Sequence, residues 1–181
     1  MSDPEELVHP LWLVGYGAWP VAARAERLVA ALGSRGVTRL VDVRLNPSAS
    51  GVLPGPYGPK PWTLQAGRSG IVGLLADAGI AYDWLVELGN PQRHDPAMAV
   101  LRDHIADPDG GWPVHRGLAL LAPLVRRPAE VVALLCACPD HRTCHRTVVA
   151  RALAALHFDG RLLIRDLRTG ERVETVSEDR A

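Results

Sequence analysis

Short hydrophobic runs alternate along this chain with longer segments in which hydrophobic residues recur at the spacing of a helix. The short runs predict strands, and the longer periodic segments predict helices. We expect strands at residues 11–14, 39–44, 80–85, 131–135 and 161–167, with a further short strand at 171–176 after a turn. We expect helices at residues 21–32, 69–78, 96–105 and 117–125, and one that begins at residue 143 or 144 and ends near 156.

The order of these elements defines the fold class. A strand, a helix of about a dozen residues and a second strand form a βαβ unit with parallel strands and a right-handed crossover. Segment 131–135 is hydrophobic on both faces, as expected of a central strand that helices cover on both sides. The sequence therefore predicts a single-domain α/β three-layer sandwich. Its central sheet is mostly parallel, with about five strands and Rossmann-like topology.

The chain has 181 residues, a length that suits one domain with its own hydrophobic core. We expect residues 1–10 to be an N-terminal extension, 11–168 the α/β domain, and 169–181 a C-terminal turn or short strand and tail. Residues 46–61 are rich in proline and glycine, which predicts a long loop. Long loops in compact domains often form a lid or the wall of a binding site.

Acidic and basic residues balance at 20 each, so the net charge gives no support for binding to nucleic acid or to an anionic membrane. No hydrophobic run approaches the roughly 18–20 residues that a membrane-spanning helix needs. The first six residues are acidic and lack the order of a secretory signal. We therefore expect a cytoplasmic protein whose cysteines stay reduced.

All three cysteines lie within nine positions, at the predicted junction between strand 131–135 and the helix that follows. In a parallel sheet, ligands bind beyond the carboxyl ends of the strands. The ionisable or thiol side chains at the ends of the predicted strands are Tyr16, Asp42, Arg44, Cys136 and Cys138. Because core packing does not require such residues at several strand ends, we predict that they converge on a site.

The predicted helix start Thr143-Cys144-His145-Arg146 adds anion-binding chemistry to this site. Free amide groups and the helix dipole favour negative charge at a helix N-terminus. Arg142 and Arg146 would strengthen the binding of a phosphate or carboxylate. The same environment favours a thiolate at Cys144.

Several interpretations of the cysteines stay open. Cys144 precedes Val148 by one helical turn and can be a small buried core residue. The thiols can serve as a nucleophile or redox group. They can also bind zinc together with His141 or His145, although the sequence requires no cofactor. Cys136 and Arg142 are spaced as in phosphatase phosphate-binding loops, but Pro139 removes one of the amides that such a loop needs.

The chain resembles the domain-of-unknown-function 488 family over about residues 12–165. The resemblance rests on Val14-Gly15-Tyr16-Gly17, Asp42-Val43-Arg44 with Pro47, Gly79-Ile80-Ala81-Tyr82, Leu88-Gly89, Leu135-Cys136-Ala137 and Cys144-His145-Arg146. It implies an uncharacterised bacterial or archaeal α/β protein. It marks as motif positions Tyr16, Asp42, Arg44, Pro47, Tyr82, Cys136, Cys144, His145 and Arg146. The chain departs from the family pattern at residues 48–50, at Asn90 and at Cys138, which stands where the family usually has glutamate.

The leading hypothesis is an enzyme that acts on a phosphate-bearing or other anionic substrate, and the expected ligand is a small anionic or nucleotide-like molecule. We expect the anion to be bound by Tyr16, Arg44, Tyr82, Arg142 and Arg146, and proton or nucleophile work to fall to Asp42, Cys144 or His145. One alternative is a non-catalytic nucleic-acid or nucleotide binding module that adds Trp62 for stacking. Another is a zinc protein whose ligands come from Cys136, Cys138, Cys144 and His145.

Overall fold

The computed structural model of the chain describes residues 9–45, 70–92 and 95–175. Its strands are β1 (Leu11–Gly15), β2 (Arg39–Asp42), β3 (Ala81–Trp84), β4 (Val132–Cys136), β5 (Ile164–Asp166) and β6 (Arg172–Val173). Its α-helices are α1 (Arg24–Ser34), α2 (Ile71–Asp77), α3 (Ala99–Ala106), α4 (Pro113–Arg126) and α5 (His145–His157). Three short 3-10 helices are η1 (Tyr16–Ala18), η2 (Val21–Ala23) and η3 (Val86–Leu88).

The strands of the described residues form one sheet in the order β3-β2-β4-β1-β5-β6. The first five strands in that order run parallel, and β6 pairs antiparallel with β5. The predicted mostly parallel α/β fold is therefore confirmed. The order places β4 between β1 and β2, so the strands of the first predicted βαβ unit are parallel without being neighbours.

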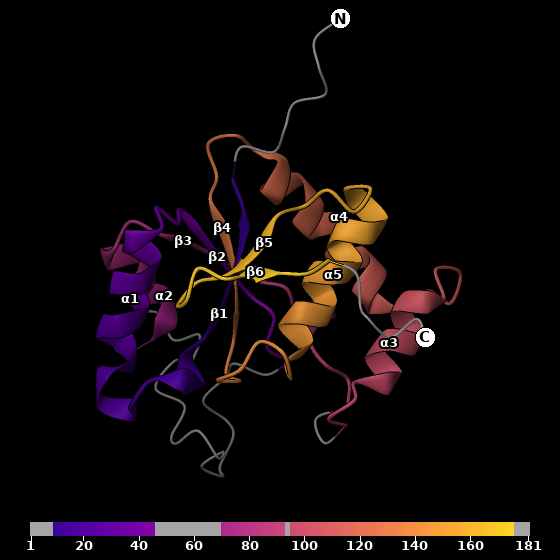
Figure 1. The fold of residues 1–181 in the computed structure, drawn as a ribbon, viewed down its shortest axis with the longest axis horizontal. Helices are drawn as coiled ribbons and strands as arrows, with labels where there is room; N and C mark the ends of the chain where they lie inside the picture. The colour runs from indigo at the N-terminus through magenta and orange to yellow at the C-terminus, as the bar shows by residue number, and fades with distance from the viewer. Residues whose placement is uncertain (1–8, 46–69, 93–94, 176–181) are drawn as a thin grey trace, which may run out of the picture.

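Helices cover both faces of the sheet and complete a three-layer sandwich (Figure 1). One hydrophobic core, with Leu28, Leu40 and Leu75 among its members, joins the sheet to α1 and α2. The other, which includes Leu121, Leu134 and Leu153, joins the sheet to α3, α4 and α5. Thus α1 and α2 cover one face, whereas α5, which follows β4, lies on the opposite face. This change of side beside β4 creates the position at which open α/β sheets bind ligands.

Strand β4 is buried at all five of its positions, which confirms the prediction of a central strand that is hydrophobic on both faces. The ends of some helices differ from the predicted ones. Helix α4 begins at Pro113, four residues before its hydrophobic periodicity, because proline suits the first turn of a helix. Helix α3 begins only at Ala99, since Met98 before it has a left-handed backbone with φ of 54°.

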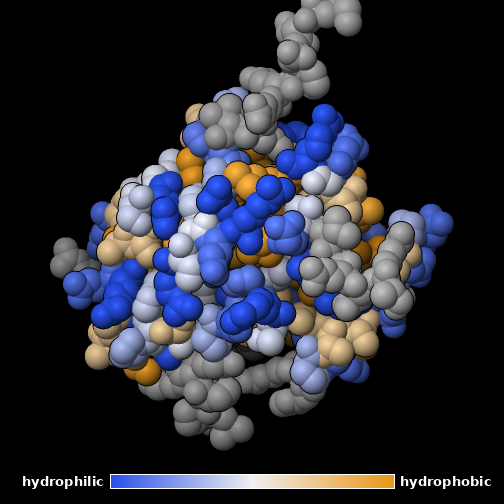
Figure 2. Space-filling view, in the orientation of Figure 1, coloured by the Kyte–Doolittle hydropathy of each residue, from blue (hydrophilic) through white to orange (hydrophobic). Residues whose placement is uncertain are grey.

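The predicted loop at 46–61 lies outside the described residues, as do most of the N-terminal extension and the end of the predicted strand 171–176. The face seen in Figure 2 is largely hydrophilic, with smaller hydrophobic areas between the polar side chains. Among the described residues, no helix has the length and hydrophobicity required to cross a membrane.

Candidate functional site

The register of the central strands brings three chain segments to one edge of the sheet. Gly15 of β1 lies opposite Cys136 of β4, and Asp42 of β2 lies opposite Leu135 on the other side of β4. Tyr16 follows β1 directly. The carboxyl ends of β1, β2 and β4 therefore meet at the same level, as the sequence analysis expected of parallel strands.

Asp42 is the centre of a buried polar network at the end of β2. Its side chain is fully buried and forms an ion pair with Arg44, whose Nε lies 2.9 Å from Oδ1 and 3.0 Å from Oδ2. The hydroxyl of Tyr82 donates to Oδ2 of Asp42 at 2.7 Å. Arg44 also donates from Nη1 to the hydroxyl of Tyr16 at 3.3 Å. The carboxylate of Asp42 is thus surrounded by donors.

Burial and neighbouring charges change the pKa of three members of this network, Tyr82, Arg44 and Tyr16. Burial, followed by the charge of Asp42, raises the pKa of Tyr82, so its hydroxyl remains a donor. Burial opposes the charge on Arg44, but its hydrogen bonds to Asp42 outweigh that effect and raise the pKa of Arg44. Burial raises the pKa of Tyr16 as well. The arrangement fixes the end of β2 against β3 and β1.

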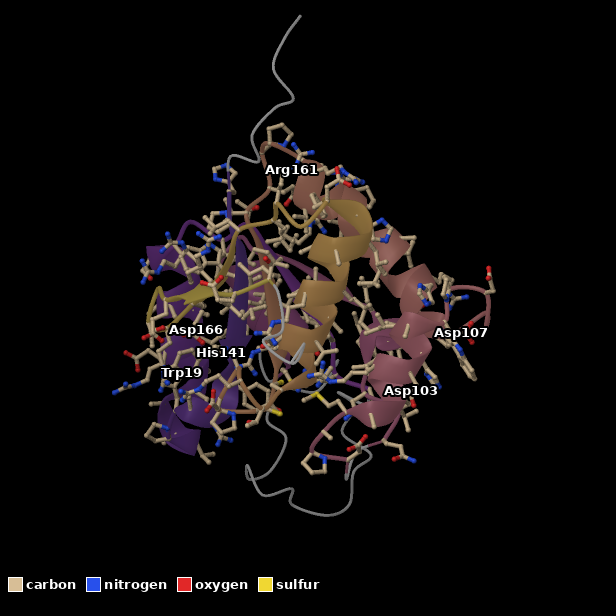
Figure 3. The ribbon with its side chains drawn as sticks, turned by 45° about the vertical axis from the view of Figure 1, so that its right-hand side comes forward. Trp19, Asp103, Asp107, His141, Arg161 and Asp166 are labelled. Carbon is tan, nitrogen blue, oxygen red and sulfur yellow. The ribbon has the colours of Figure 1, made fainter. Side chains whose placement is uncertain are left out.

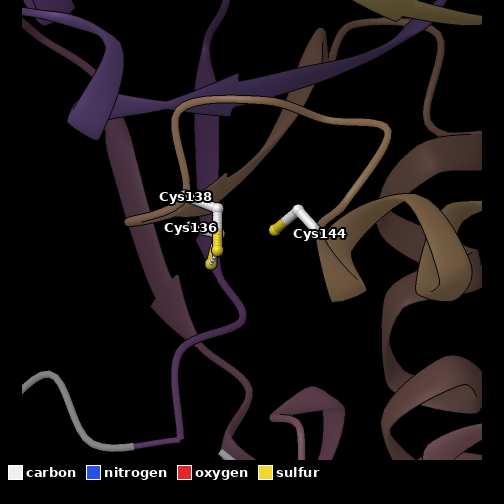
Figure 4. A group of neighbouring side chains, drawn as sticks. All are labelled: Cys136, Cys138 and Cys144. Carbon is white, nitrogen blue, oxygen red and sulfur yellow. Dashed lines mark hydrogen bonds between the residues drawn. The ribbon is translucent and has the colours of Figure 1, made fainter. Parts of the chain in front are cut away.

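The three cysteines gather at the end of β4, and all are free thiols (Figure 4). Their Sγ atoms lie within 4.8 Å of one another, with 3.7 Å between Cys136 and Cys138. Cys136 and Cys138 lie two residues apart and point the same way, whereas Cys144 faces them from the start of α5 (Figure 4). Cys136 and Cys144 are buried and Cys138 is partly exposed. A single strand–loop–helix junction therefore supplies the whole cluster.

His145 lies against this cluster with a defined ring orientation. Its Nε2 is 2.7 Å from the carbonyl oxygen of Val43, which can only accept, so Nε2 carries a hydrogen. Its Nδ1 consequently faces the sulfur atoms, at 3.6 Å from Cys136 and 3.9 Å from Cys144. The backbone of the segment after β2 thereby orients a side chain of α5.

The three thiols of the cluster differ in pKa. Hydrogen bonds from Cys138 and Cys144 lower the pKa of Cys136 well below the ordinary thiol value. Hydrogen bonding to Cys136 in turn raises the pKa of Cys138, and burial raises the pKa of Cys144 to about 12. Burial opposes the charged form of His145, but the charge of Cys136 outweighs it and raises the pKa of His145 to about 9. Cys136 is thus the favoured thiolate.

Arg146 is fully buried beside the cluster. Its Nη1 donates to the carbonyl of Cys138 at 2.9 Å. Its Nε and Nη2 have no hydrogen-bond partner among the residues that the structure describes. The guanidinium packs directly on Gly15, where an added Cβ would lie 2.7 Å from Nη1 and 1.8 Å from the carbonyl oxygen of Cys138. Glycine at position 15 therefore makes room for a buried cation.

A pocket of about 310 Å³ opens beside the cluster. It is lined by Asn90, Asp95, Pro96, Met98, Cys138, Thr143 and His145. Sequence analysis missed Asp95, Pro96 and Met98, which reach the pocket from the segment before α3. Asn90 had a signal, since it departs from the family pattern. The carboxylate of Asp95 accepts from the backbone N–H groups of Ala97 and Ala99.

Two predicted residues lie elsewhere in the loop between β4 and α5. The side chain of Arg142 is 78% exposed and pairs with Asp140 at 3.1 Å, and it is not among the residues that line the pocket. His141 lies outside the group formed by the three cysteines. Figure 3 shows His141 to the left of Asp103, in α3, and of Asp107, which follows that helix. Trp62 lies outside the described residues.

Sequence analysis also missed Arg24, the first residue of α1. It is buried, its Nε donates to the carbonyl of Trp19 at 3.0 Å, and its guanidinium lies 5.6 Å from the centre of the Tyr16 ring. Nothing in its local sequence distinguishes Arg24 from a solvent-facing helix residue, because its burial depends on the turn after β1.

Fold and site together define an α/β protein with a thiol- and arginine-rich site at the carboxyl end of its central strand. The family model described as "Domain of unknown function DUF488" matches residues 62–153, and the chain belongs to this family. The matched segment contains Tyr82, Cys136 and the Cys144-His145-Arg146 motif, whereas Asp42 precedes it. Searches of curated proteins and of solved structures found no match.

Proposed function

We propose that this protein is an enzyme that acts on a small anionic molecule, phosphate-bearing or carboxylate, bound in the pocket beside Cys138, Thr143 and His145. The observation that carries the proposal is the fully buried guanidinium of Arg146, which has donors without a partner among the described residues and contacts the pocket residue Cys138 through its carbonyl. A buried cation is stable only when negative charge lies close by.

The start of α5 adds to the positive character of this region. Cys144 is the N-cap residue of α5, and its side chain accepts no hydrogen bond from the free amides of the first turn. The first turn contains no acidic residue but does contain His145 and Arg146. Because the amino end of a helix is itself positive, basic residues there are favoured only beside an anion. A thiolate supplies part of that charge, and an anionic substrate would supply more.

The size and lining of the pocket support a small-molecule substrate over a nucleic acid. A volume of about 310 Å³ lies at the lower end of the range typical of ligand pockets. The chain has equal numbers of acidic and basic residues and therefore no overall attraction for a polyanion. Thr143 offers a hydroxyl, and His145 offers an imidazole whose orientation is fixed by Val43. Reactive and binding groups thus share one pocket wall.

A direct test combines binding with turnover on the full chain. Calorimetric titrations would use inorganic phosphate, phenyl phosphate and succinate, and mass spectrometry would follow the consumption of a panel of phosphate-bearing and carboxylate metabolites. We expect at least one of the three probes to bind and at least one metabolite to be consumed. Thr143→Val should weaken the binding about tenfold, the loss expected for one hydrogen bond. His145→Gln should abolish consumption.

Arg151→Gln is the matched control, since Arg151 lies on the same helix and donates instead to the carbonyl of Glu174. It should bind and turn over like the unmodified chain. Binding without any consumption across the panel would overturn the enzymatic proposal in favour of a binding module. Failure of all three probes to bind would overturn the anionic substrate.

A further inference from the structure

We propose that Cys136, Cys138 and Cys144 bind one zinc ion, with the fourth coordination position directed at the pocket. The metal site stands on the sulfur geometry by itself. Only the use of the fourth position rests on the proposed substrate pocket.

The spacing of the sulfur atoms is that of ligands to a single ion. All three lie within 4.8 Å of one another, and Cys136 and Cys138 are 3.7 Å apart. Tetrahedral zinc with Zn–S bonds of about 2.3 Å requires sulfur atoms separated by about 3.8 Å. One edge of the triangle already has this length, and the others need to contract by about 1 Å at most. Thiolate ligands are also those that select zinc among the divalent cations.

The fold presents these ligands from two sides. Cys136 ends the central strand, and Cys138 follows with its side chain on the same side of the backbone, as alternate residues of an extended chain do. Cys144 approaches from the start of α5, which packs on the opposite side of the cluster (Figure 4). The loop of residues 139–143 closes the triangle. An ion bound here would therefore connect the sheet to the helix layer.

The charge of the surroundings matches a metal–trithiolate. Zinc with three thiolates carries a net charge of −1, and the thiol protons leave to solvent on binding. Arg146 carries +1, is fully buried, and donates to the carbonyl of the ligand residue Cys138 at 2.9 Å. Its Nε and Nη2 lack a hydrogen-bond partner within the described part of the chain. The zinc–thiolate group would supply part of the negative charge that this buried guanidinium needs, beside that of an anion in the pocket.

Polar groups of His145 and of the pocket lie beside the cluster. His145 directs Nδ1 at two of the sulfur atoms, while Nε2 is held by the carbonyl of Val43. Both Cys138 and His145 line the pocket, so a small molecule there reaches the cluster. Three protein ligands and an accessible fourth position are the arrangement of catalytic zinc sites, whereas structural sites are closed by a fourth residue. The pocket would thus deliver its ligand to the metal, beside His145.

Elemental analysis of the full chain, purified under reducing conditions without phosphate, phenyl phosphate or succinate in the buffer, tests the metal site. We expect one zinc per chain. The apoprotein should bind one Co²⁺ and develop sulfur-to-cobalt charge-transfer absorption together with the strong visible bands of tetrahedral cobalt. Cys138→Ser, at the most exposed of the three ligands, should weaken zinc binding by about 100-fold or more, since even the loss of a residue that only orients a ligand costs about 10–100-fold. Arg151→Gln should bind zinc normally, because Arg151 lies on α5 but donates to the carbonyl of Glu174 and is not a ligand.

Less than one tenth of an equivalent of metal in a chain with three reduced thiols, together with a cobalt titration that lacks the charge-transfer band, would overturn the proposal. Stoichiometric copper would overturn the choice of zinc. If Cys138→Ser does not fold, the cobalt spectrum of the unmodified chain decides by itself. Stoichiometric zinc without binding of phosphate, phenyl phosphate or succinate would contradict the proposed substrate and leave the metal site supported.

Discussion

At some positions of this site, the space available selects the residue type as strongly as chemical function does. Gly15 has φ of −128°, a backbone conformation that any residue adopts, so its backbone does not require glycine. What requires glycine is the neighbouring Arg146 and the carbonyl of Cys138. The sequence marked Gly15 only as part of the motif Val14-Gly15-Tyr16-Gly17, whereas its contact with Arg146 joins residues 131 positions apart. Local patterns carry no information about such a contact.

We therefore predict that Gly15→Ala lowers the free energy of unfolding by about 3 kcal/mol, since the new Cβ forces a buried guanidinium and a backbone carbonyl to move. Urea denaturation would measure the change. The matched control is Gly33→Ala in α1, where an added Cβ meets nothing within 4 Å. Alanine there should stabilise the protein by about 0.5–1 kcal/mol, because it favours the helix. Equal stability of Gly15→Ala and the unmodified chain would contradict the close packing of Arg146 on Gly15.

The buried carboxylate of Asp42 gives a second prediction for a single residue. Tyr82→Phe removes the hydroxyl that donates to Asp42 at 2.7 Å and leaves the ring in place. The loss of a hydrogen bond to a charged group should lower the free energy of unfolding by about 1.5–3 kcal/mol. Chemical denaturation would show this as a lower midpoint with an unchanged slope. An unchanged midpoint would mean that the hydroxyl contributes nothing to holding Asp42.

Among the elements, β4 was predicted to within one residue at each end, because a short hydrophobic run without alternation is typical of a central parallel strand in an α/β chain. Helix ends were less predictable. The start of α3 depends on Met98, whose left-handed backbone no local signal predicts. Charged side chains also connect β2 to its two neighbours in the sheet. Arg39 of β2 bonds to Asp83 of β3 and to Glu130, which precedes β4.

Glu130→Gln tests this connection between elements. Hydrogen bonds from Arg39 lower the pKa of Glu130 in the folded state below its ordinary value of 4.5. A carboxylate with a depressed pKa stabilises the fold above its unfolded pKa and loses that effect as the pH falls through the folded pKa. The variant should therefore be less stable by about 1 kcal/mol at pH 7, and the difference should shrink below about pH 4.5.

The control for this pair is Glu174→Gln, since Glu174 and Arg172 form a largely exposed pair at 4.0 Å. Exposed pairs contribute little, so this variant should change stability by less than about 0.5 kcal/mol at either pH. Denaturation curves at pH 7 and at pH 3 would compare the two variants. A Glu130→Gln deficit that is the same at both pH values would contradict the role assigned to the ion pair.

At the scale of the whole molecule, the sequence predicted the class of fold but not the neighbours in the sheet. Parallel strands and covering helices follow from periodicity, whereas the position of β4 between β1 and β2 follows from long-range packing. That position creates the site. It sets Cys136 beside Gly15 on one side and places the end of β2 on the other, where Val43 orients His145. Several residues of the site could therefore be named from the sequence, whereas their contacts and the pocket residues Asp95, Pro96 and Met98 could not.

Because the end of β4 lies against the start of α5, the proposed zinc binding depends on two layers of the fold. The three cysteines belong to the central strand and to the start of α5, so zinc would connect two of the three layers and bind only when both are in place. A ligand that binds only the native state, at 100 times its dissociation constant, stabilises it by about 2.7 kcal/mol. For a chain of this length, that gain raises the melting temperature by about 5–10 °C.

We therefore predict that treatment with EDTA lowers the melting temperature by about this amount and that zinc restores it. Circular dichroism at a fixed protein concentration would follow both steps. Cys144→Ser is the informative variant, because it removes the ligand from the helix side while the two strand-side cysteines remain. Its melting temperature should not respond to EDTA or to zinc. If the unmodified chain, with its thiols reduced, melts at the same temperature with EDTA and with zinc, then no metal joins these two layers.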